Sequence, residues 1–353
     1  MAALLRSNTV TVGQLDAFDE VIDVRSPAEF ALDHVAGAVN CPVLDNEERA
    51  RVGTIYTQVS PFDARKVGAA LVSKNIARHI EERFRSRERG WRPLVYCWRG
   101  GKRSGAMAHV LREIGWDAAT LEGGYRAYRR EVVARLGELP SRFRFRIVCG
   151  ATGSGKSRLI ETLAAQGAQV LDLERLACHR GSVLGELPGE PQPSQKMFDS
   201  FVWSALKRLD PARPVIVEAE SRKIGQLQVP GALLERMREG ECLRIEVPVA
   251  ERVRFLIGEY RHFLDDPAAL KEKLRCLTAL YGRTVTDRWL SQTDAGAWNE
   301  LVADLLVNHY DPAYLRASSK NYLHYDKALR LRLDRLEPAE FARAASELIK
   351  TSV

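Results

Sequence analysis

Short apolar runs alternate with longer segments of helical periodicity along this chain. Within residues 64–84, for example, Val67, Leu71, Ile76 and Ile80 form one apolar stripe at helical spacing. Runs with the length and composition of buried strands occupy residues 21–24, 94–97, 145–149, 169–173, 214–219 and 243–247. Strands that alternate with helices predict an α/β protein with parallel sheets.

A break in this pattern near residues 137–142 indicates a domain boundary. The segment YRAYRREVVARLGELPSRFRFR begins as a helix, stops near Gly137 and Pro140, and leads into a new strand. A chain of 353 residues also exceeds what one hydrophobic core comfortably supports. We therefore predict two α/β domains, residues 1–138 and 139–353. Helical patterns dominate beyond about residue 250, so we expect a helical C-terminal part that covers the second sheet or extends from it.

The composition is that of a folded, basic protein, with 45% hydrophobic and 28% charged residues. Its formal net charge of +7 favours a polyanionic partner, with nucleic acid as the leading candidate. The six cysteines include no Cys-x-x-Cys pair, which argues against a zinc ribbon or a disulfide framework, and we assign no metal ligand with certainty. The N-terminal stretch lacks the apolar core of a signal peptide, and no run approaches the roughly 18 residues of a membrane span. We expect a cytoplasmic protein.

The stretch YCWRGGKRS, residues 96–104, places a cysteine in a basic, glycine-rich loop. A strand ends at Cys97 and a helix opens near Arg103, so backbone N–H groups and a helix N-terminus surround one point. Such a nest binds a tetrahedral anion and stabilises a thiolate, which predicts that Cys97 and Arg103 are catalytic. The remaining residues of this predicted donor-anion site are Trp98, Arg99, Gly100, Gly101, Lys102 and Ser104. The spacing Cys-x5-Arg is also that of cysteine phosphatases, so phosphatase chemistry stays open.

A second anion-binding loop, GATGSGKS, joins an apolar run to a helical segment. A Gly-x4-Gly-Lys-Ser pattern in this context predicts backbone N–H groups that cradle a diphosphate, with Lys156 neutralising it and Ser157 reaching a magnesium ion. The predicted phosphate-binding residues are Gly150, Ala151, Thr152, Gly153, Ser154, Gly155, Lys156 and Ser157. Acidic residues at strand ends are Asp172 and Glu174 in one run and Glu218 and Glu220 in another. We expect Asp172 and either Glu218 or Glu220 to assist a metal, and the alternative that these residues only cap a strand or a following helix stays open.

Arginines and aromatic residues are interleaved between residues 125 and 146. Guanidinium groups engage RNA phosphates and stack on bases, and aromatic rings accept unstacked nucleotides. The candidates for RNA contact are Arg126, Arg129, Arg130 and Arg142. A solvated helix face followed by a linker would have the same composition, and that interpretation stays open.

Longer stretches around the two loops resemble known families. Residues 21–43, VIDVRSPAEFALDHVAGAVNCPV, together with the cysteine loop and LEGGYRAYR, resemble the rhodanese domain over residues 12–136. A rhodanese loop followed by a phosphate loop resembles the tRNA 2-selenouridine synthase family, with which DNEERARVGTIYTQVSPFDARKVGAALV and VIVEAESRKIG also agree. The resemblance implies a rhodanese-like parallel-sheet domain followed by a P-loop NTPase-like α/β domain with a helical C-terminal part.

The family resemblance implies an enzyme that converts 2-thiouridine at the wobble position of tRNA to 2-selenouridine. The substrates would be tRNA, geranyl diphosphate and selenophosphate, with an S-geranyl intermediate, Cys97 as the selenium carrier and no tightly bound cofactor. The phosphate loop would hold either geranyl diphosphate or a nucleotide. The alternatives are a cysteine phosphatase or sulfurtransferase fused to a nucleotide-binding module, and, in another class, a noncatalytic RNA-binding switch.

Overall fold

The computed structural model describes residues 8–350 and divides the chain into two compact units. The first is Met1–Arg135 with Ser194–Ser204, and the second is Leu136–Pro193 with Ala205–Val353. This division differs from the predicted domains 1–138 and 139–353, because most of helix α8 (Gln195–Lys207) belongs to the first unit. Residues 1–7, part of the stretch considered above for a signal peptide, lie outside the described residues.

Buried contacts of α8 explain why it belongs with the N-terminal residues. The Ser200 hydroxyl donates a 2.8 Å hydrogen bond to the buried carboxylate of Asp33, 167 positions earlier in the chain. The Trp203 ring meets the buried Tyr128 ring at 5.5 Å between centroids, nearly edge to face. No local sequence pattern reports contacts at such separations.

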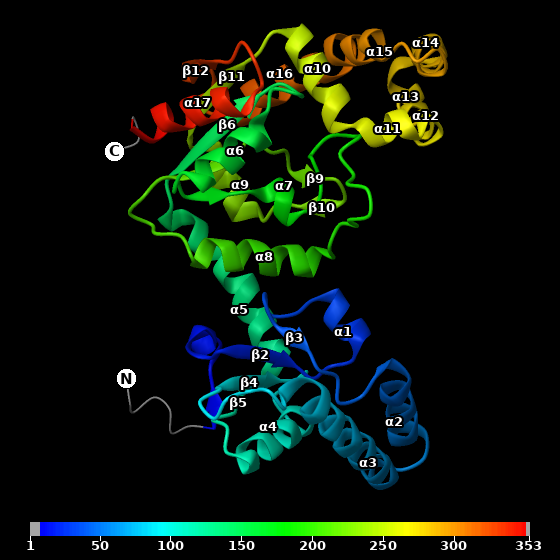
Figure 1. The fold of residues 1–353 in the computed structure, drawn as a ribbon, viewed down its shortest axis with the longest axis vertical. Helices are drawn as coiled ribbons and strands as arrows, with labels where there is room; N and C mark the ends of the chain where they lie inside the picture. Colours follow the sequence, from blue (N-terminus) through cyan, green and yellow to red (C-terminus); the bar gives the residue numbers. More distant parts are fainter. Residues whose placement is uncertain (1–7, 351–353) are drawn as a thin grey trace. The chain divides into compact units, whose positions relative to one another are not determined.

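Five parallel strands form the sheet of the first unit (Figure 1). Their spatial order is β1 (Thr9–Val10), β5 (Ala119–Leu121), β4 (Pro93–Tyr96), β2 (Glu20–Asp23), β3 (Val39–Asn40). The central strand β4 is buried along its whole length, as expected for a parallel sheet covered by helices. The helices are α1 (Pro27–Leu32), α2 (Asn46–Gln58), α3 (Pro61–His79), α4 (Lys102–Ile114) and α5 (Gly124–Glu138), with a 3₁₀ turn η2 (Val12–Ala17) and a π turn η3 (Ile80–Phe84).

Helix α4 packs against β4 and holds the segment between them over the sheet. Met107 and Leu111 on α4 are fully buried in one apolar cluster with Val95 of β4. Each fully buried side chain of this kind contributes about 1.5–3 kcal/mol relative to exposure. The cluster therefore holds the start of α4 and the end of β4 in place, which is where the cysteine loop lies.

The second unit contains another five-stranded parallel sheet. Its order is β12 (Leu329–Arg332), β11 (Glu241–Glu246), β6 (Phe145–Gly150), β8 (Val215–Glu218), β7 (Val170–Leu171). Because all strands run the same way, the ends of β6, β7 and β8 meet at one edge of the sheet. A separate antiparallel hairpin pairs β9 (Lys223–Ile224) with β10 (Leu227–Gln228). The phosphate loop follows the central strand β6.

Helices surround this sheet and dominate the chain after residue 250, as predicted. They are α6 (Lys156–Ala165), α7 (Leu173–Leu176), α9 (Gly231–Arg238), α10 (Val249–Glu259), α11 (Arg261–Asp265), α12 (Pro267–Arg275), α13 (Thr278–Tyr281), α14 (Arg283–Asp294), α15 (Trp298–Leu305), α16 (Asp311–Asn321) and α17 (Pro338–Lys350). Shorter turns are η4 (Leu139–Arg142), η5 (Leu306–Tyr310) and η6 (Tyr325–Lys327). Within the described residues, no helix is both long and apolar enough to cross a membrane.

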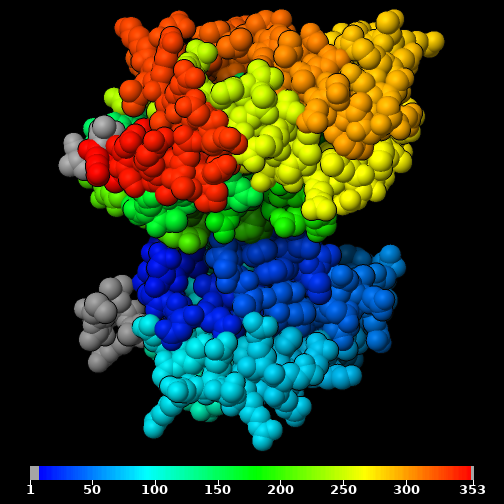
Figure 2. All heavy atoms as spheres, turned by 45° about the horizontal axis from the view of Figure 1, so that its top comes forward, coloured from blue at the N-terminus to red at the C-terminus, as the bar shows by residue number. Residues whose placement is uncertain are grey.

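The C-terminal helices contribute to the core of the second unit. Phe341 and Ala345 of α17 share an apolar cluster with Leu159 and Leu163 of α6, the helix that follows the phosphate loop. Helix α10 packs in turn on α15. In the space-filling view the residues after 250, coloured yellow to red, form much of the visible surface of the second unit (Figure 2).

The structure confirms the predicted fold class, and each predicted strand region contains a strand. The run at 169–173 is shorter than expected, because only Val170–Leu171 pairs with β8. Strand β12 was not predicted. It lies at the edge of its sheet with mostly exposed side chains, so it has no apolar run to reveal it.

Candidate functional site

The cysteine loop lies at the carboxyl end of β4 in the first unit. Cys97 follows the last residue of that strand, and α4 begins five positions later at Lys102. The Cys97 sulfur accepts hydrogen bonds of 3.3 Å from the backbone N–H of Gly101 and from the Ser104 hydroxyl. The sequence prediction that the loop N–H groups and the start of the helix converge on this sulfur agrees with this geometry.

The surroundings of Cys97 favour its thiolate. Burial of the side chain, which is 4% exposed, raises the pKa of the Cys97 thiol. Hydrogen bonds from the Ser104 hydroxyl and from the N–H groups of Ser104, Gly101 and Arg99 outweigh burial, and the pKa is lowered overall. A thiolate is the nucleophilic form of cysteine.

Two glycine pairs allow the loop to close over the sheet. Gly100 has φ +65°, and a Cβ there would lie 2.5 Å from the carbonyl oxygen of Leu121. Gly124 has φ +57°, and a Cβ there would lie 2.3 Å from the carbonyl oxygen of Cys97. The next N–H, that of Tyr125, donates to the same Cys97 carbonyl at 2.8 Å. The stretch LEGGY therefore fixes the backbone conformation of the cysteine loop.

The three cations of the loop have different environments. The side chains of Arg99 and Lys102 are exposed, so an anion arriving from solvent can contact them. Arg103 pairs with the carboxylate of Glu29 at 3.3 Å, and Glu29 also pairs with Arg49. Among the hydrogen bonds of the described residues, none joins Arg103 to the Cys97 sulfur. Since Arg103 is held by a carboxylate, Arg99 and Lys102 are better placed than Arg103 to meet a donor anion.

A buried polar network supports the loop from below, and sequence reasoning did not assign it. Arg25 is 1% exposed and pairs with Asp23 at 2.6 Å, while its guanidinium lies 4.0 Å from the centre of the Tyr125 ring. The Tyr125 hydroxyl donates to one carboxylate oxygen of Asp33 at 2.7 Å. The Ser200 hydroxyl of α8 donates to the other oxygen of Asp33. Contacts at these sequence separations are visible only in the folded chain.

The phosphate loop joins β6 to α6 in the second unit. Gly153 has φ +79° and Gly155 has φ +77°, both in the left-handed region. A Cβ on Gly153 would lie 2.8 Å from Leu256, and one on Gly155 would lie 2.7 Å from Phe341. Only glycine fits both the backbone conformation and the packing at these positions. The helical C-terminal part thus shapes the phosphate loop directly.

Residues from the C-terminal helices also hold the two ends of this loop. The N–H of Gly150 donates to the Tyr314 hydroxyl at 2.6 Å, and the Lys156 ammonium lies 5.6 Å from the Tyr314 ring centre. The Lys156 ammonium donates to the Gly150 carbonyl at 2.7 Å. Arg252, 5% exposed, donates to the carbonyl of Thr152 at 2.9 Å. The sequence pattern identified the loop itself but not Tyr314 or Arg252.

The acidic residues at the strand ends take distinct roles. The Ser157 hydroxyl donates to Glu174 at 2.6 Å, and the Glu174 N–H donates to Glu218 at 2.6 Å. Asp172, one of the expected residues, instead caps α7 by accepting from the N–H of Arg175 at 2.8 Å. Burial and neighbouring carboxylates raise the pKa of Glu218 and of Glu220 well above the ordinary value. The carboxylate beside Ser157 is therefore that of Glu174.

The phosphate loop and the neighbouring acidic residues offer few protein oxygen atoms for a metal ion. The described residues contain no group of three or more His, Cys, Asp or Glu side chains arranged to hold a metal. Magnesium commonly keeps several waters and uses one or two protein oxygens together with substrate phosphates. The Ser157 hydroxyl and the Glu174 carboxylate are suitable oxygen ligands beside a bound diphosphate.

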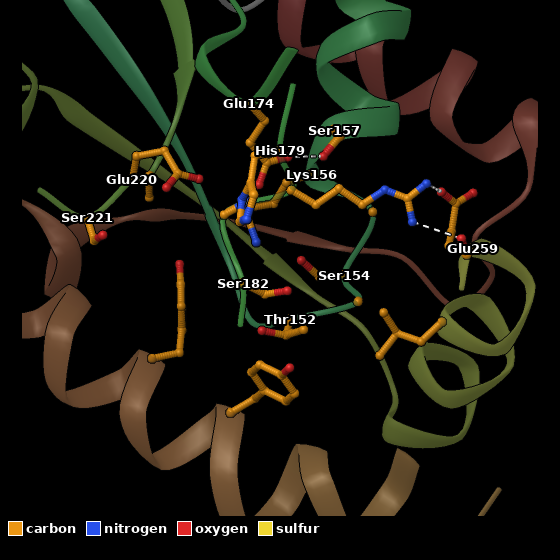
Figure 3. A pocket seen from close by; sticks show the side chains of 18 of the residues that line it. Thr152, Ser154, Lys156, Ser157, Glu174, His179, Ser182, Glu220, Ser221 and Glu259 are labelled. Atoms are coloured by element: carbon orange, nitrogen blue, oxygen red, sulfur yellow. Dashed lines mark hydrogen bonds and ion pairs between the residues drawn. The ribbon is translucent and has the colours of Figure 1, made fainter. Parts of the chain in front are cut away.

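A cavity of about 560 Å³ opens around the phosphate loop. Figure 3 shows Thr152, Lys156, Ser157, Glu174 and Glu220 around the same space. The opposite wall comes from one face of η5 and α16, with lining residues Tyr310, Ala313, Tyr314, Ala317, Ser318 and Asn321. Their spacing of three and four positions is that of a single helix face.

The four arginines predicted to contact RNA fall into two groups. Arg126 and Arg130 are exposed on α5, and Arg142 is exposed in η4. Arg129 is instead 19% exposed, pairs with Asp199 and donates to the carbonyl of Lys196 at 3.0 Å. We therefore reassign Arg129 from RNA contact to the attachment of α8.

Comparison with known families matches both units. The model of the tRNA 2-selenouridine synthase AAA domain matches residues 143–281, and the model of the rhodanese-like domain matches residues 11–131. Among solved structures, the N-terminal domain of a putative ATP/GTP binding protein from Clostridium difficile 630 is 33% identical, covering 35% of this chain and 98% of its own, with a TM-score of 0.32. A rhodanese-related protein from Thermoplasma volcanium is 20% identical. The match covers 35% of this chain and 91% of that protein, with a TM-score of 0.23.

Curated relatives named tRNA 2-selenouridine synthase align with most of the chain. The protein from Nitrosomonas europaea is 34% identical over 279 residues, which is 78% of this chain and 71% of the relative. The protein from Alcanivorax borkumensis is 33% identical over 326 residues, 83% of this chain and 88% of the relative. The protein from Cupriavidus pinatubonensis is 31% identical over 341 residues, which is 85% of this chain and 89% of the relative. The chain that carries the cysteine loop and the phosphate loop belongs to the tRNA 2-selenouridine synthase family.

Proposed function

We propose that this protein is a cytoplasmic transferase that converts wobble-position 2-thiouridine in tRNA to 2-selenouridine, through an S-geranyl intermediate. One observation carries the proposal. A thiol of lowered pKa in a glycine-rich, basic loop and a separate Gly-x4-Gly-Lys-Ser loop occur in one chain of this family. The first loop suits a selenium donor that bears phosphate, and the second suits a prenyl donor that bears diphosphate.

In the first half-reaction the phosphate loop holds geranyl diphosphate. The thiocarbonyl sulfur of 2-thiouridine forms a bond to C1 of the geranyl group, and the C1–O bond breaks with its electron pair going to diphosphate. The base loses its N3 proton, so the S-geranyl product is neutral. Lys156 and the loop N–H groups stabilise the charge that develops on the leaving diphosphate. Alkylation turns a poor sulfide leaving group into a thiol leaving group.

In the second half-reaction Cys97 carries selenium to C2 of the S-geranyl base, and geranylthiol leaves. The Cys97 thiolate first exchanges with a small disulfide to form a mixed disulfide. Water then cleaves the P–Se bond of selenophosphate, which releases phosphate, while the selenium bonds to the Cys97 sulfur and displaces the small thiol, giving the perselenide. The perselenide selenium then bonds to C2, and a thiol returns two electrons when it cleaves the S–Se bond to Cys97. Transfer is therefore redox-neutral overall, with phosphate and geranylthiol as the products besides selenouridine.

Two variants test the division of labour between the loops. Lys156→Ala should lower geranylation of 2-thiouridine RNA by about a hundredfold or more, because it removes a charge-stabilising group. The same variant should still selenate RNA that is supplied already geranylated. Cys97→Ser should geranylate normally and stall at the S-geranyl base. Mass analysis of the nucleosides, with geranyl diphosphate and selenophosphate added separately and together, measures both steps.

The alternatives give different results in the same experiment. Equal loss of both steps in Lys156→Ala, or a requirement of both steps for ATP, would favour a nucleotide in the phosphate loop. Release of phosphate from an aryl phosphate, abolished in Cys97→Ser, would favour a cysteine phosphatase. Absence of any base conversion in the wild-type protein would leave an RNA-binding role and reject the proposed reaction.

A further inference from the structure

A second, apolar cavity lies beside the phosphate pocket within the second unit. It encloses about 60 Å³ between α10, α11, α12 and α15. The side chains that line it are almost all apolar, among them Ile257, Phe263, Leu270, Trp298 and Leu301. Most of these belong to one buried cluster that is separate from the core under the sheet.

The apolar cavity and the phosphate pocket meet at the phosphate loop. Thr152, Ser182, Leu256, Tyr260 and Tyr310 line both. Thr152 is a residue of the phosphate loop itself, and Leu256 lies against the next residue of the loop. A molecule whose head group is bound by the phosphate loop can thus extend an attached group into the apolar cavity without leaving the unit.

The chemistry of the lining decides which attached group fits. A purine or pyrimidine carries ring nitrogens and exocyclic groups that need hydrogen-bond partners, and a buried polar group without one costs about 1–3 kcal/mol. The polar groups of this cavity lie at the shared boundary, where the Ser182 and Tyr260 hydroxyls are 3.5 Å apart. Deeper in, Leu, Ile, Val, Phe and Trp side chains offer apolar contact to a hydrocarbon.

We infer that this cavity binds the first carbons of the hydrocarbon chain of a prenyl diphosphate whose diphosphate lies in the phosphate loop. The inference rests on the proposed function, because it places the tail of the donor that the proposal assigns to that loop. Each methylene that moves from water into the cavity should tighten binding about fourfold. A volume of about 60 Å³ has room for only a few carbon atoms, so the rest of a geranyl chain lies in the adjoining pocket of about 560 Å³.

The experiment compares geranyl diphosphate with inorganic diphosphate by titration calorimetry on the full-length protein. Val302→Phe fills the cavity from a half-buried lining position on α15. Val307→Phe is the matched control, because Val307 is 53% exposed and outside the lining. Wild type and Val307→Phe should bind geranyl diphosphate at least tenfold more tightly than inorganic diphosphate. Val302→Phe should keep its affinity for inorganic diphosphate and lose most of that preference.

Each other result has a distinct meaning. A wild-type protein that binds both diphosphates equally, or a Val302→Phe variant that keeps the preference, overturns the inference and leaves the proposed function standing. Failure of wild type to bind either diphosphate overturns the proposed function as well. Weaker ATP binding in Val302→Phe, with geranyl diphosphate unaffected, also overturns the inference and assigns the cavity to a nucleoside.

A second substitution keeps the test decisive if Val302→Phe does not fold. Val302→Thr keeps the volume of the side chain and places a hydroxyl in the cavity, where a hydrocarbon cannot pair with it. It should weaken geranyl diphosphate binding about threefold or more and leave inorganic diphosphate unchanged. Equal effects on the two diphosphates would overturn the inference.

Discussion

The Ser157 hydroxyl donates a 2.6 Å hydrogen bond to the carboxylate of Glu174. Ser157 is the residue of the phosphate loop that is expected to reach magnesium. Because Glu174 contacts the Ser157 hydroxyl, its carboxylate is the acidic group placed beside the expected magnesium position. Its own N–H is held by Glu218 at 2.6 Å, which orients the start of α7. Asp172 also lines the pocket, but it accepts from the N–H of Arg175 and caps the same helix, and no hydrogen bond of the described residues joins it to Ser157.

Glu174→Gln should weaken the response of geranylation to magnesium. The substitution keeps the size of the side chain and removes the charge beside Ser157, so the magnesium concentration for half-maximal rate should rise about tenfold or more. Asp172→Asn is the control, because asparagine caps a helix as well as aspartate does. Rates measured across a magnesium titration check this, and equal shifts in the two variants would contradict the assignment of Glu174.

Cys97 should react with iodoacetamide at lower pH than an ordinary cysteine. Only the thiolate reacts, and hydrogen bonds to the sulfur lower the pKa of Cys97 despite its burial. Ser104→Ala removes one of these donors, so the midpoint of the rate against pH should move upward. The measurement is best made in a Cys276→Ser background, since Cys276 is the exposed cysteine. An unchanged midpoint in Ser104→Ala would contradict the role of the hydroxyl.

Arg126 and Arg130 should contribute to tRNA affinity, whereas Arg129 should contribute to stability. Replacing the two exposed arginines together by glutamine should reduce the slope of log affinity against log salt by about 0.7 to 0.9 for each phosphate that is no longer neutralised. Arg129→Gln removes the ion-pair partner of Asp199 and leaves it the hydrogen bond from the Gln195 amide, so the free energy of unfolding should fall by about 1 kcal/mol with the salt slope unchanged. Salt-dependent binding and thermal unfolding separate the two effects. If Arg129→Gln reduced the salt slope of tRNA affinity as much as the Arg126 and Arg130 substitutions do, Arg129 would be an RNA-contacting residue after all.

Glu218→Gln should stabilise the protein at neutral and alkaline pH. Burial and the neighbouring carboxylates of Asp172, Glu174 and Glu220 raise the pKa of Glu218 well above its ordinary 4.5. The unfolded chain therefore releases this proton near pH 4.5 while the folded chain keeps it, so stability falls as the pH rises from there to the raised pKa. Each unit of pKa difference corresponds to about 1.4 kcal/mol.

Denaturant unfolding of wild type and Glu218→Gln from about pH 4 to about pH 9 measures this dependence. Glutamine keeps an oxygen that accepts from the Glu174 N–H and has no proton to lose in this range. The two proteins should differ little at the acidic end and diverge above it, with the variant more stable. Parallel curves would show that Glu218 is not the group responsible.

Local patterns in the sequence were sufficient for the two loops and for the central strands. Cys97 and Lys156 each lie between an apolar run and a helix, and a glycine-rich turn at that place exposes N–H groups whatever packs around it. Buried parallel strands such as β4 and β6 are apolar along most of their length, so they too are visible locally. The class of fold followed from these features, and the binding of two anions is the prediction that they support.

Tertiary structure decided which side chains support the loops. Glu174 and Asp172 lie on one short stretch, and only the fold shows that Glu174 meets Ser157 while Asp172 caps a helix. Tyr314 reaches Gly150 across 164 positions, and Ser200 reaches Asp33 across 167. Local periodicity carries no information on such distant pairs, because burial and packing of remote segments select them.

The same limit applies to the apolar cavity and to the arginines. Leucines on α10 and α15 have the spacing of ordinary core residues, and only packing leaves a space between them beside the phosphate loop. Arg129 and Arg130 are neighbours in a basic segment, yet one is held by Asp199 and the other is exposed. Charge pattern and composition favoured an anionic partner, and the packing of the chain decided which basic side chains are exposed.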